Sequence, residues 1–208
     1  MTVGAFGAGP WPASDPRNRA DRLIPAALLH RSVRVAKPLA RARIHATACG
    51  VYELAIAGER VGDRHLAPGW TDYRARVHYQ TYDVTALLAP GEHELVATVG
   101  DGWWCGHLAT PFGANWYGHD KALKLALHLD YADGTSEVIA TDAGWQGGTG
   151  PIRLADLMEG QIIDATRAPG AWRPVAVMEA PAGRLQAQPD EPARVLATIQ
   201  VLGRGEVS

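Results

Sequence analysis

A strict two-residue alternation is the feature that most constrains the fold of this chain. Apolar side chains occupy every second position of one segment: Leu123, Leu125, Leu127, Leu129 and Tyr131. This period places them on one face of a β-strand, because successive side chains of a strand point to opposite faces. The turn sequence Asp133-Gly134-Thr135 follows, and β-branched residues return in 137–141. The pattern predicts a β-hairpin with one buried face.

Weaker strand signals precede this hairpin. Residues 29–36 and 42–48 have strand-like patterns, and Gly58-Glu59 indicates a tight turn between residues 51–57 and 60–62. The helix signal is a single turn after Thr85. The chain also contains 23 Gly and 14 Pro among 208 residues, which favours many turns and short elements. We therefore predict an all-β fold.

The domain organisation follows from where these strand signals lie. Residues 1–27 have no sustained period and are predicted to form an extended N-terminal arm. Residues 28–173 are predicted to form the β domain. Residues 174–208 are predicted to be a linker, rich in Pro and Ala, followed by the first strand of a second β domain over residues 194–202. Two long Trp-rich connections, 67–73 and 102–119, are typical of functional or interface loops.

The charge balance limits the classes of partner. The formal net charge is −2, so we expect neither nucleic acid nor an anionic membrane as a partner. No apolar run is long enough to cross a membrane. The first residues lack a basic start followed by an apolar block, so they do not resemble a secretory signal. We therefore expect a cytoplasmic location unless a signal is missing from this sequence.

Catalytic machinery is not predicted in this chain. Glycoside hydrolysis uses two carboxyl groups, but Asp63, Asp72, Asp101, Glu53 and Glu159 each stand at a turn or loop, where carboxylates commonly cap backbone groups. The eight histidines match no zinc-binding spacing, and no Gly-x-Ser-x-Gly motif is present. We expect no catalytic residue here.

An ordered set of motifs carries a resemblance to a known family. The motifs are Val51-Tyr52-Glu53-Leu54, Gly58-Glu59-Arg60-Val61-Gly62-Asp63, Ala67-Pro68-Gly69-Trp70-Thr71-Asp72-Tyr73, Tyr79-Gln80-Thr81-Tyr82-Asp83-Val84-Thr85, Pro90-Gly91-Glu92, Gly100-Asp101-Gly102-Trp103-Trp104, Tyr131-Ala132-Asp133-Gly134-Thr135 and Asp156-Leu157-Met158-Glu159-Gly160-Gln161. In this order and spacing, residues 28–173 resemble the N-terminal β-sandwich domain of bacterial α-L-rhamnosidases, the family-78 glycoside hydrolases.

The resemblance implies a jelly-roll β-sandwich of the galactose-binding-like type. In some members this domain is a calcium-dependent rhamnose-binding module, and in others it is scaffold. The resemblance also implies a separate (α/α)₆ barrel with the catalytic carboxylates, which this chain does not contain. We therefore expect a non-catalytic accessory domain whose partners are a rhamnose-containing glycan and the catalytic domain of a parent enzyme. The alternative is a structural domain that braces this barrel and binds no ligand.

Candidate site residues combine oxygen ligands with aromatic rings. Calcium takes oxygen ligands on irregular loops, so the candidates are Asp63, then Asn115 with the carbonyls of residues 111–118, then Asp72. The candidate carbohydrate contacts are Asp63, Trp70, Trp103, Trp104, Asn115 and Trp116. Aromatic rings stack on sugar faces, and indole supplies one N–H donor. The alternative interpretation of the same residues is that the acids cap turns and that the tryptophans plug the sandwich ends or face a neighbouring domain.

Overall fold

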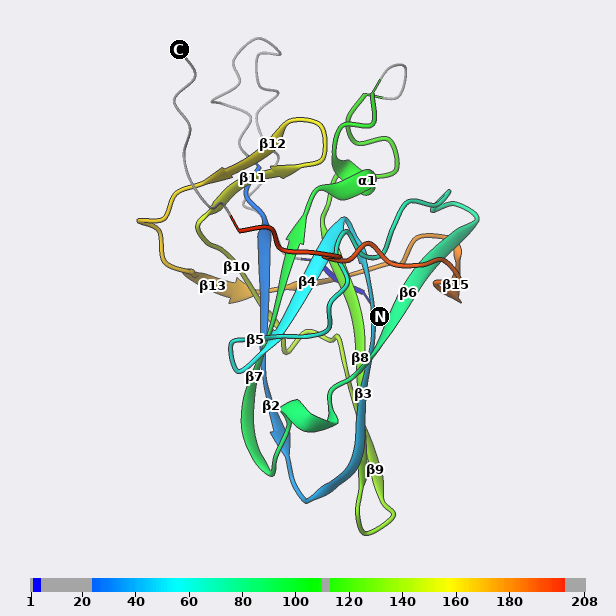
Figure 1. Ribbon diagram of the computed structural model, residues 1–208, viewed down its shortest axis with the longest axis vertical. Helices are drawn as coiled ribbons and strands as arrows, with labels where there is room; N and C mark the ends of the chain where they lie inside the picture. Colours follow the sequence, from blue (N-terminus) through cyan, green and yellow to red (C-terminus); the bar gives the residue numbers. More distant parts are fainter. Residues whose placement is uncertain (1, 5–23, 110–112, 201–208) are drawn as a thin grey trace.

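Two β-sheets pack face to face in this protein, and the computed structural model describes residues 2–4, 24–109 and 113–200 (Figure 1). The first sheet contains β1 Thr2–Gly4, β3 Leu39–Cys49, β6 Arg76–Asp83, β8 Ala122–Tyr131, β9 Ser136–Ala140, β14 Ala176–Met178 and β15 Arg184–Ala187. The second contains β2 Ala27–Val35, β4 Val51–Ile56, β5 Glu59–Arg60, β7 Gly91–Gly100, β10 Gln146–Thr149 and β13 Gly170–Pro174. A separate hairpin consists of β11 Ile152–Asp156 and β12 Gly160–Ile163. The prediction of an all-β sandwich is confirmed.

The strand order explains why the sandwich closes around one core. The first sheet runs β14-β1-β8-β3-β6-β15, with β9 also paired to β8, and the second runs β13-β10-β2-β7-β4-β5. Among the described residues, the strand pairs are antiparallel except for the parallel pair β15–β6. β3 and β4 are joined through Gly50 alone, whose φ is +134°, so the chain passes from one sheet directly into the other.

The alternating residues of β8 lie in the core, as the sequence predicts. Leu123, Leu127 and Leu129 are fully buried, and Leu125 and Tyr131 are nearly so. They pack with buried side chains of the opposite sheet, such as Leu29 and Leu95. Burying each large apolar side chain stabilises the fold by about 1.5–3 kcal/mol relative to exposure. The β8–β9 hairpin is confirmed, with Leu129 opposite Glu137 across it.

Short helical elements lie at both ends of the sandwich. A 3₁₀ turn, η2 Thr85–Leu87, follows β6 at the predicted place. Its first residue does not cap it through the side chain; Thr85 Oγ1 instead donates to Asp83 Oδ1 and accepts the Ala42 N–H. A short helix, α1 Gly102–Cys105, replaces part of the long loop expected at 102–119. Among the described residues, no helix is long and apolar enough to cross a membrane.

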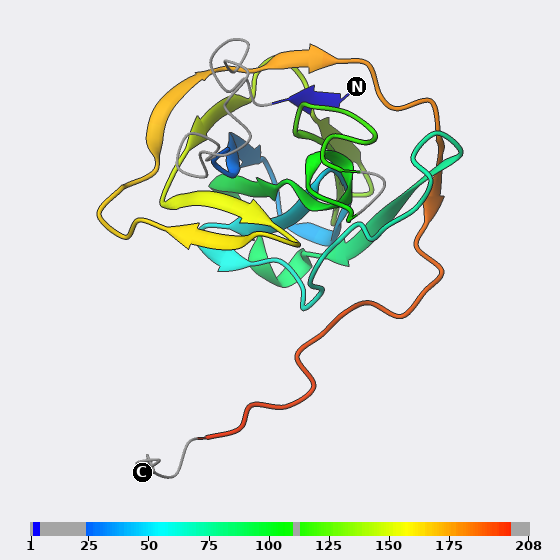
Figure 2. The same ribbon diagram turned by 90° about the horizontal axis from the view of Figure 1, so that it is seen from above.

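From β13 onward, the chain runs round the outside of the sandwich (Figure 2). β13 pairs with β10, β14 with β1, and β15 with β6, so residues 170–187 pass from one sheet to the other. The structure thus finds two short strands, β14 and β15, within the predicted linker. Residues 194–200, expected as a strand, have no assigned strand, and residues 201–202 lie outside the described part. The start of a second β domain stays a prediction.

The predicted N-terminal arm is described only at its two ends. Residues 2–4 form β1, which pairs with β8 and β14 inside the first sheet. Residues 24–27 are described up to the start of β2, and Ala26 and Ala27 are buried. Residues 1 and 5–23 lie outside the described residues. The extended arm over residues 1–27 therefore stays a prediction.

Candidate functional site

Five aromatic side chains gather at the upper end of the sandwich, the end with α1 and the β11–β12 hairpin in Figure 1. We call Trp70, Tyr73, Trp104, Trp116 and Tyr117 the aromatic cluster. Tyr73 meets Trp104 and Tyr117 edge to face, with ring centroids 5.4 and 4.9 Å apart. Trp104 and Tyr117 stack at 6.2 Å, and Trp70 Nε1 donates to the Tyr117 hydroxyl at 3.4 Å. The structure thus brings three predicted tryptophans into one group.

Backbone contacts hold the cluster in place. The Tyr117 N–H donates to the Trp104 carbonyl at 3.3 Å, which fixes residues 113–119 against α1. The Tyr73 hydroxyl donates to the Gly69 carbonyl at 2.9 Å, and Tyr73 is 1% exposed. Burial, followed by the neighbouring Cys49, raises the pKa of Tyr73 above its ordinary range, so its hydroxyl stays protonated as a donor. Tyr73 is the buried support of the cluster.

Arg74 covers the outer side of the cluster. Its guanidinium lies 5.6 Å from the centroid of the Trp116 ring and 5.4 Å from that of Tyr117. It also donates to the Trp116 carbonyl at 3.4 Å. Trp70 is 51% exposed and Trp116 is 41% exposed. The arrangement offers solvent two indole surfaces beside one cation, which suits a neutral, hydroxyl-rich ligand.

Trp103 is placed differently from the other candidate tryptophans. It lies on α1 and is half-buried, and the ring contacts given above do not include it. Sequence reasoning assigned Trp103 and Trp104 to a loop. That assignment is wrong, because Gly102 starts a helical turn with φ +56°, close against Gly50 and Val51. A contact between Trp103 and a carbohydrate stays a prediction.

Two of the predicted oxygen ligands, Asp63 and Asp72, have a carboxylate oxygen engaged in another interaction, and Asn115 is held through its main chain. Asp63 follows the turn at Gly62, and its Oδ2 lies 2.8 Å from Arg194 Nε in an ion pair. Asp72 Oδ1 accepts the N–H of Arg74 at 3.1 Å. The N–H of Asn115 donates to the Cys105 carbonyl at 3.1 Å.

These interactions bear on the predicted calcium site. In the described part of the chain, no group of three or more His, Cys, Asp or Glu side chains is arranged to hold a metal ion. A calcium ion at Asp63 would also compete with the guanidinium of Arg194, because both bind the same carboxylate. Asp63, Asp72 and Asn115 as calcium ligands stay a prediction.

Sequence reasoning missed a buried ion pair beneath the aromatic cluster. Lys121 Nζ forms an ion pair with Asp101 Oδ1, and each side chain is 7% exposed. Cys105, at the end of α1, donates through Sγ to the Asp101 carbonyl at 3.4 Å. Burial raises the pKa of Asp101 above its ordinary value, and Lys121 opposes that rise. One sequence feature could have indicated this ion pair: Lys121 directly precedes the apolar alternation of β8. A lysine that is buried at such a place needs an acidic partner.

Asp156 fastens the β11–β12 hairpin to the α1 region. Its Oδ2 accepts the His107 N–H at 2.8 Å, and its Oδ1 accepts the N–H groups of Met158 and Glu159 at 2.7 and 2.9 Å. Burial alone raises the pKa of Asp156, but these backbone donors together hold it below its ordinary value of 3.8. His107 also lies between Asp156 and Glu159. The network holds the upper end of the sandwich together.

Fold and site together define a jelly-roll β-sandwich domain with aromatic residues of α1 and of the neighbouring loops gathered at one end. The family model for the alpha-L-rhamnosidase N-terminal domain matches residues 37–197. The chain belongs to this family.

Named relatives agree with this assignment. An alpha-L-rhamnosidase of Streptomyces avermitilis is 45% identical over 172 residues, which cover 81% of this chain and 16% of that protein. One of Formosa agariphila is 33% identical over 140 residues, covering 66% of this chain and 15% of that protein. The chain therefore spans about one sixth of the length of these relatives.

Solved structures show the same domain. The crystal structure of the Streptomyces avermitilis alpha-L-rhamnosidase complexed with L-rhamnose matches with a TM-score of 0.78 and 42% identity, over 83% of this chain and 18% of that one. The alpha-L-rhamnosidase of Aspergillus terreus matches with a TM-score of 0.79 and 28% identity, over 94% of this chain and 23% of that one. Both likenesses extend beyond fold alone, because sequence identity accompanies them.

Proposed function

We propose that this chain is a non-catalytic accessory domain of an α-L-rhamnosidase, and that its aromatic cluster contacts L-rhamnose units of a glycan. The observation that carries the proposal is two exposed indoles at one end of the sandwich: Trp116 lies against Arg74, and Trp70 donates to the Tyr117 hydroxyl. The family and the rhamnose complex of the Streptomyces avermitilis relative support this choice of sugar.

The physical basis is the match between a sugar ring and this surface. The C–H face of a sugar packs on an aromatic ring, and the hydroxyls at its edge accept hydrogen bonds from Arg74. The cluster needs little ordering on binding, because Tyr73 and Trp104 already support it from beneath. Few atoms are buried against an open platform, so we expect a dissociation constant on the order of 0.1–1 mM for the monosaccharide.

Calcium is the second part of the proposal. A hard cation can bind vicinal hydroxyls and loop carboxylates together, which would strengthen the hold on a neutral sugar. In this proposal Asp63 exchanges its ion pair with Arg194 for the cation, and Asp72 and Asn115 supply further oxygen atoms. Arg194→Ala should then strengthen calcium binding, because it removes the competing guanidinium. Isothermal titration with calcium alone measures this directly.

The test of sugar binding is calorimetry with L-rhamnose, with millimolar calcium or with chelator. We expect heat with the wild-type chain in calcium and a loss of at least about tenfold in affinity in Trp116→Ala. Trp172→Ala is the matched control, because Trp172 is a tryptophan of similar exposure on β13, packed against His30 outside the cluster. Binding that survives Trp116→Ala and Trp70→Ala would show that the sugar sits elsewhere. No heat with the wild-type chain would overturn rhamnose binding itself.

A second candidate function is a structural brace for a catalytic barrel. Apolar side chains are exposed on the β11–β12 hairpin, with Met158 at 63% and Ile163 at 59%, and on the tail, with Leu196 at 96% and Ile199 at 90%. Exposed apolar side chains in groups mark interfaces. We expect Met158→Ser with Ile163→Ser to leave the isolated chain's stability unchanged and to lower the thermal midpoint of the full-length protein. An unchanged midpoint in the full-length protein would exclude this brace.

A further inference from the structure

A lysine and an aspartate are buried in direct contact at the upper end of the sandwich. Asp101 directly follows β7 of the second sheet, and Lys121 directly precedes β8 of the first sheet. Lys121 Nζ contacts Asp101 Oδ1, and both side chains are 7% exposed. By contrast, the side chains of the ion pair between Lys37 and Asp133 are 46% and 47% exposed. The contact between Lys121 and Asp101 therefore differs from a surface ion pair, because it is shielded from bulk water.

Burial makes the charged state of this pair costly. Two charges lose their hydration in such a site, and their mutual attraction offsets that loss only in part. When one proton moves from the ammonium of Lys121 to the carboxylate of Asp101, a neutral amine lies beside a neutral carboxylic acid. Burial raises the pKa of Asp101, which favours its protonated form, although Lys121 opposes this rise. The site therefore allows the two reactants of an amide bond to meet in their uncharged forms.

A second carboxylate lies beside Asp101 and favours the same state. A Cβ atom at Gly106 would lie 2.7 Å from Asp156 Oδ2 and 3.3 Å from Asp101 Cβ, so the two acids flank this glycine. The carboxylate of Asp156 accepts three backbone N–H groups, which stabilise its ionised form. Its negative charge adds to the rise in the pKa of Asp101. Asp156 thus acts through Asp101, by favouring its protonated form.

We propose that Lys121 and Asp101 condense to an isopeptide bond once the chain has folded. The lone pair of Lys121 Nζ attacks Asp101 Cγ, and a new Nζ–Cγ bond forms. The Cγ–OH bond of the carboxylic acid then breaks, and the hydroxyl leaves as water with one proton of the amine. The reaction consumes no oxidant and no other reactant. The fold contributes proximity, because it holds the attacking nitrogen beside Cγ and replaces the encounter of two free groups.

This bond closes a loop that carries part of the aromatic cluster. The two bonded residues are 20 positions apart in the sequence, and Trp104, Trp116 and Tyr117 lie between them. The bond also joins the end of β7 to the start of β8, and so links the two sheets. A covalent closure of this kind restricts the unfolded chain, as a disulfide does. The inference goes beyond the proposed binding of rhamnose and calcium, and depends on neither.

The test is the intact mass of the wild-type chain, kept folded at neutral pH. We expect a mass lower than that of the sequence by one water, about 18 Da. Lys121→Arg should have the full mass, because a guanidinium can pair with Asp101 but stays protonated and is no nucleophile. Lys37→Arg is the matched control, and should still lack one water. A folded wild-type chain that keeps the full mass after prolonged incubation would overturn the proposal.

The same experiment separates this bond from another way of losing water at Asp101. Asp101 precedes Gly102, and an Asp-Gly pair can cyclise to a succinimide with the same change in mass. Since a succinimide forms without Lys121, water loss at Asp101 that persists in Lys121→Arg would also overturn the proposal. Chymotrypsin cuts beside the tryptophans between the two residues, and we expect the segments that contain Asp101 and Lys121 to stay joined after digestion. Separate segments from the wild-type chain would contradict the bond, whether or not the variants fold.

Discussion

At the scale of single residues, Gly118 shows how closely the aromatic cluster is packed. A Cβ atom at this position would lie 2.6 Å from Cε2 and 2.7 Å from Nε1 of the Trp104 ring. Such approach is not tolerated, so Gly118→Ala should displace Trp104 and destabilise the chain by about 1–3 kcal/mol. Gly170→Ala is the matched control, because a Cβ atom there meets no heavy atom within 4 Å. Near-ultraviolet circular dichroism and urea unfolding measure both effects, and equal behaviour of the two variants would contradict the packing argument.

Asp156 gives the second prediction at this scale. Its side chain is 2% exposed and accepts three backbone N–H groups, so Asp156→Ala leaves these donors without their acceptor. We expect a loss of about 3 kcal/mol in the free energy of unfolding. Asp164→Ala is the control, since Asp164 accepts hydrogen bonds in an exposed turn, and it should change little.

The pH dependence of Asp156 has a definite sign. Its folded-state pKa lies below the ordinary value of 3.8, so its contribution is present above pH 3.8 and is lost as the pH falls through the folded-state pKa. Asp156→Ala should therefore lose more stability at pH 6 than at pH 3. A variant whose deficit stays constant between these pH values would show that the charge of Asp156 is irrelevant. Chemical denaturation at the two pH values provides the measurement.

At the scale of elements, a repeated Asp-x-Thr turn ends three strands. In Asp83-Val84-Thr85, Asp133-Gly134-Thr135 and Asp164-Ala165-Thr166, the Asp Oδ1 accepts both the N–H and the hydroxyl of Thr. The first of these turns also forms a hydrogen bond outside the turn: Thr85 Oγ1 accepts the N–H of Ala42 on β3 at 2.8 Å. Thr85→Val should therefore cost about 1–3 kcal/mol, since Ala42 is fully buried.

Thr166→Val tests whether the stability lost in Thr85→Val comes from the hydrogen bonds within the turn or from the hydrogen bond to Ala42 of β3. It removes the same local hydrogen bonds in an exposed turn, where the described hydrogen bonds of Thr166 go to Asp164 of the same turn. We expect its midpoint of thermal unfolding to match the wild type closely. Equal losses in Thr85→Val and Thr166→Val would mean that the turn alone matters. Calorimetric melting of both variants separates the two cases.

Elements were predictable from sequence where the signal is local. The alternation of β8 and the Asp133-Gly134 turn predicted the β8–β9 hairpin, because both depend on neighbours in the chain. Helix α1 was not predicted, since four residues carry no period and the helical turn depends on Gly102 fitting against Gly50. Asp63 shows the same limit for the site: its partner Arg194 is distant in sequence, so no local pattern reveals the ion pair.

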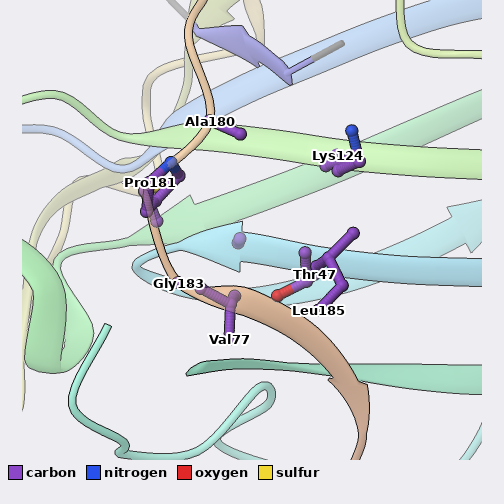
Figure 3. Close-up of a pocket in the computed structure, with 9 residues that line it drawn as sticks. Thr47, Val77, Lys124, Ala180, Pro181, Gly183 and Leu185 are labelled. Carbon is purple, nitrogen blue, oxygen red and sulfur yellow. The ribbon is translucent and has the colours of Figure 1, made fainter. Parts of the chain in front are cut away.

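At the scale of the whole molecule, the last part of the chain shows how partners decide structure. Pro and Ala in residues 174–193 predicted a linker, yet residues 176–178 and 184–187 are strands. They gain their hydrogen bonds from the edges of β1 and β6, which already exist in the sandwich. A segment of weak strand propensity can pair in this way because the partner supplies the ordered edge. By crossing from one sheet to the other, this segment also lines a narrow pocket, through Ala180, Pro181 and Gly183, beside Thr47 of β3 (Figure 3).

The whole molecule also raises the question of catalysis, because Asp101 and Asp156 interact and their pKa values are displaced in opposite directions. Opposite shifts in two nearby carboxyl groups are a usual sign of an acid–base pair. Here, however, both side chains are buried, at 7% exposure for Asp101 and 2% for Asp156. Asp101 is in an ion pair with Lys121, and the carboxylate of Asp156 accepts three backbone N–H groups. A sugar therefore meets no free carboxyl group here.

This chain alone should therefore not hydrolyse 4-nitrophenyl α-L-rhamnoside above the rate without protein. Release of nitrophenolate measures the reaction, and the Streptomyces avermitilis α-L-rhamnosidase serves as the positive control. Asp101→Asn provides the decisive comparison, because it removes the raised-pKa acid of the supposed pair. Turnover by the wild-type chain that disappears in Asp101→Asn would mean that the buried pair opens to substrate. Equal absence of turnover in both leaves the carboxylates as structural groups that hold α1 and the β11–β12 hairpin to the sandwich.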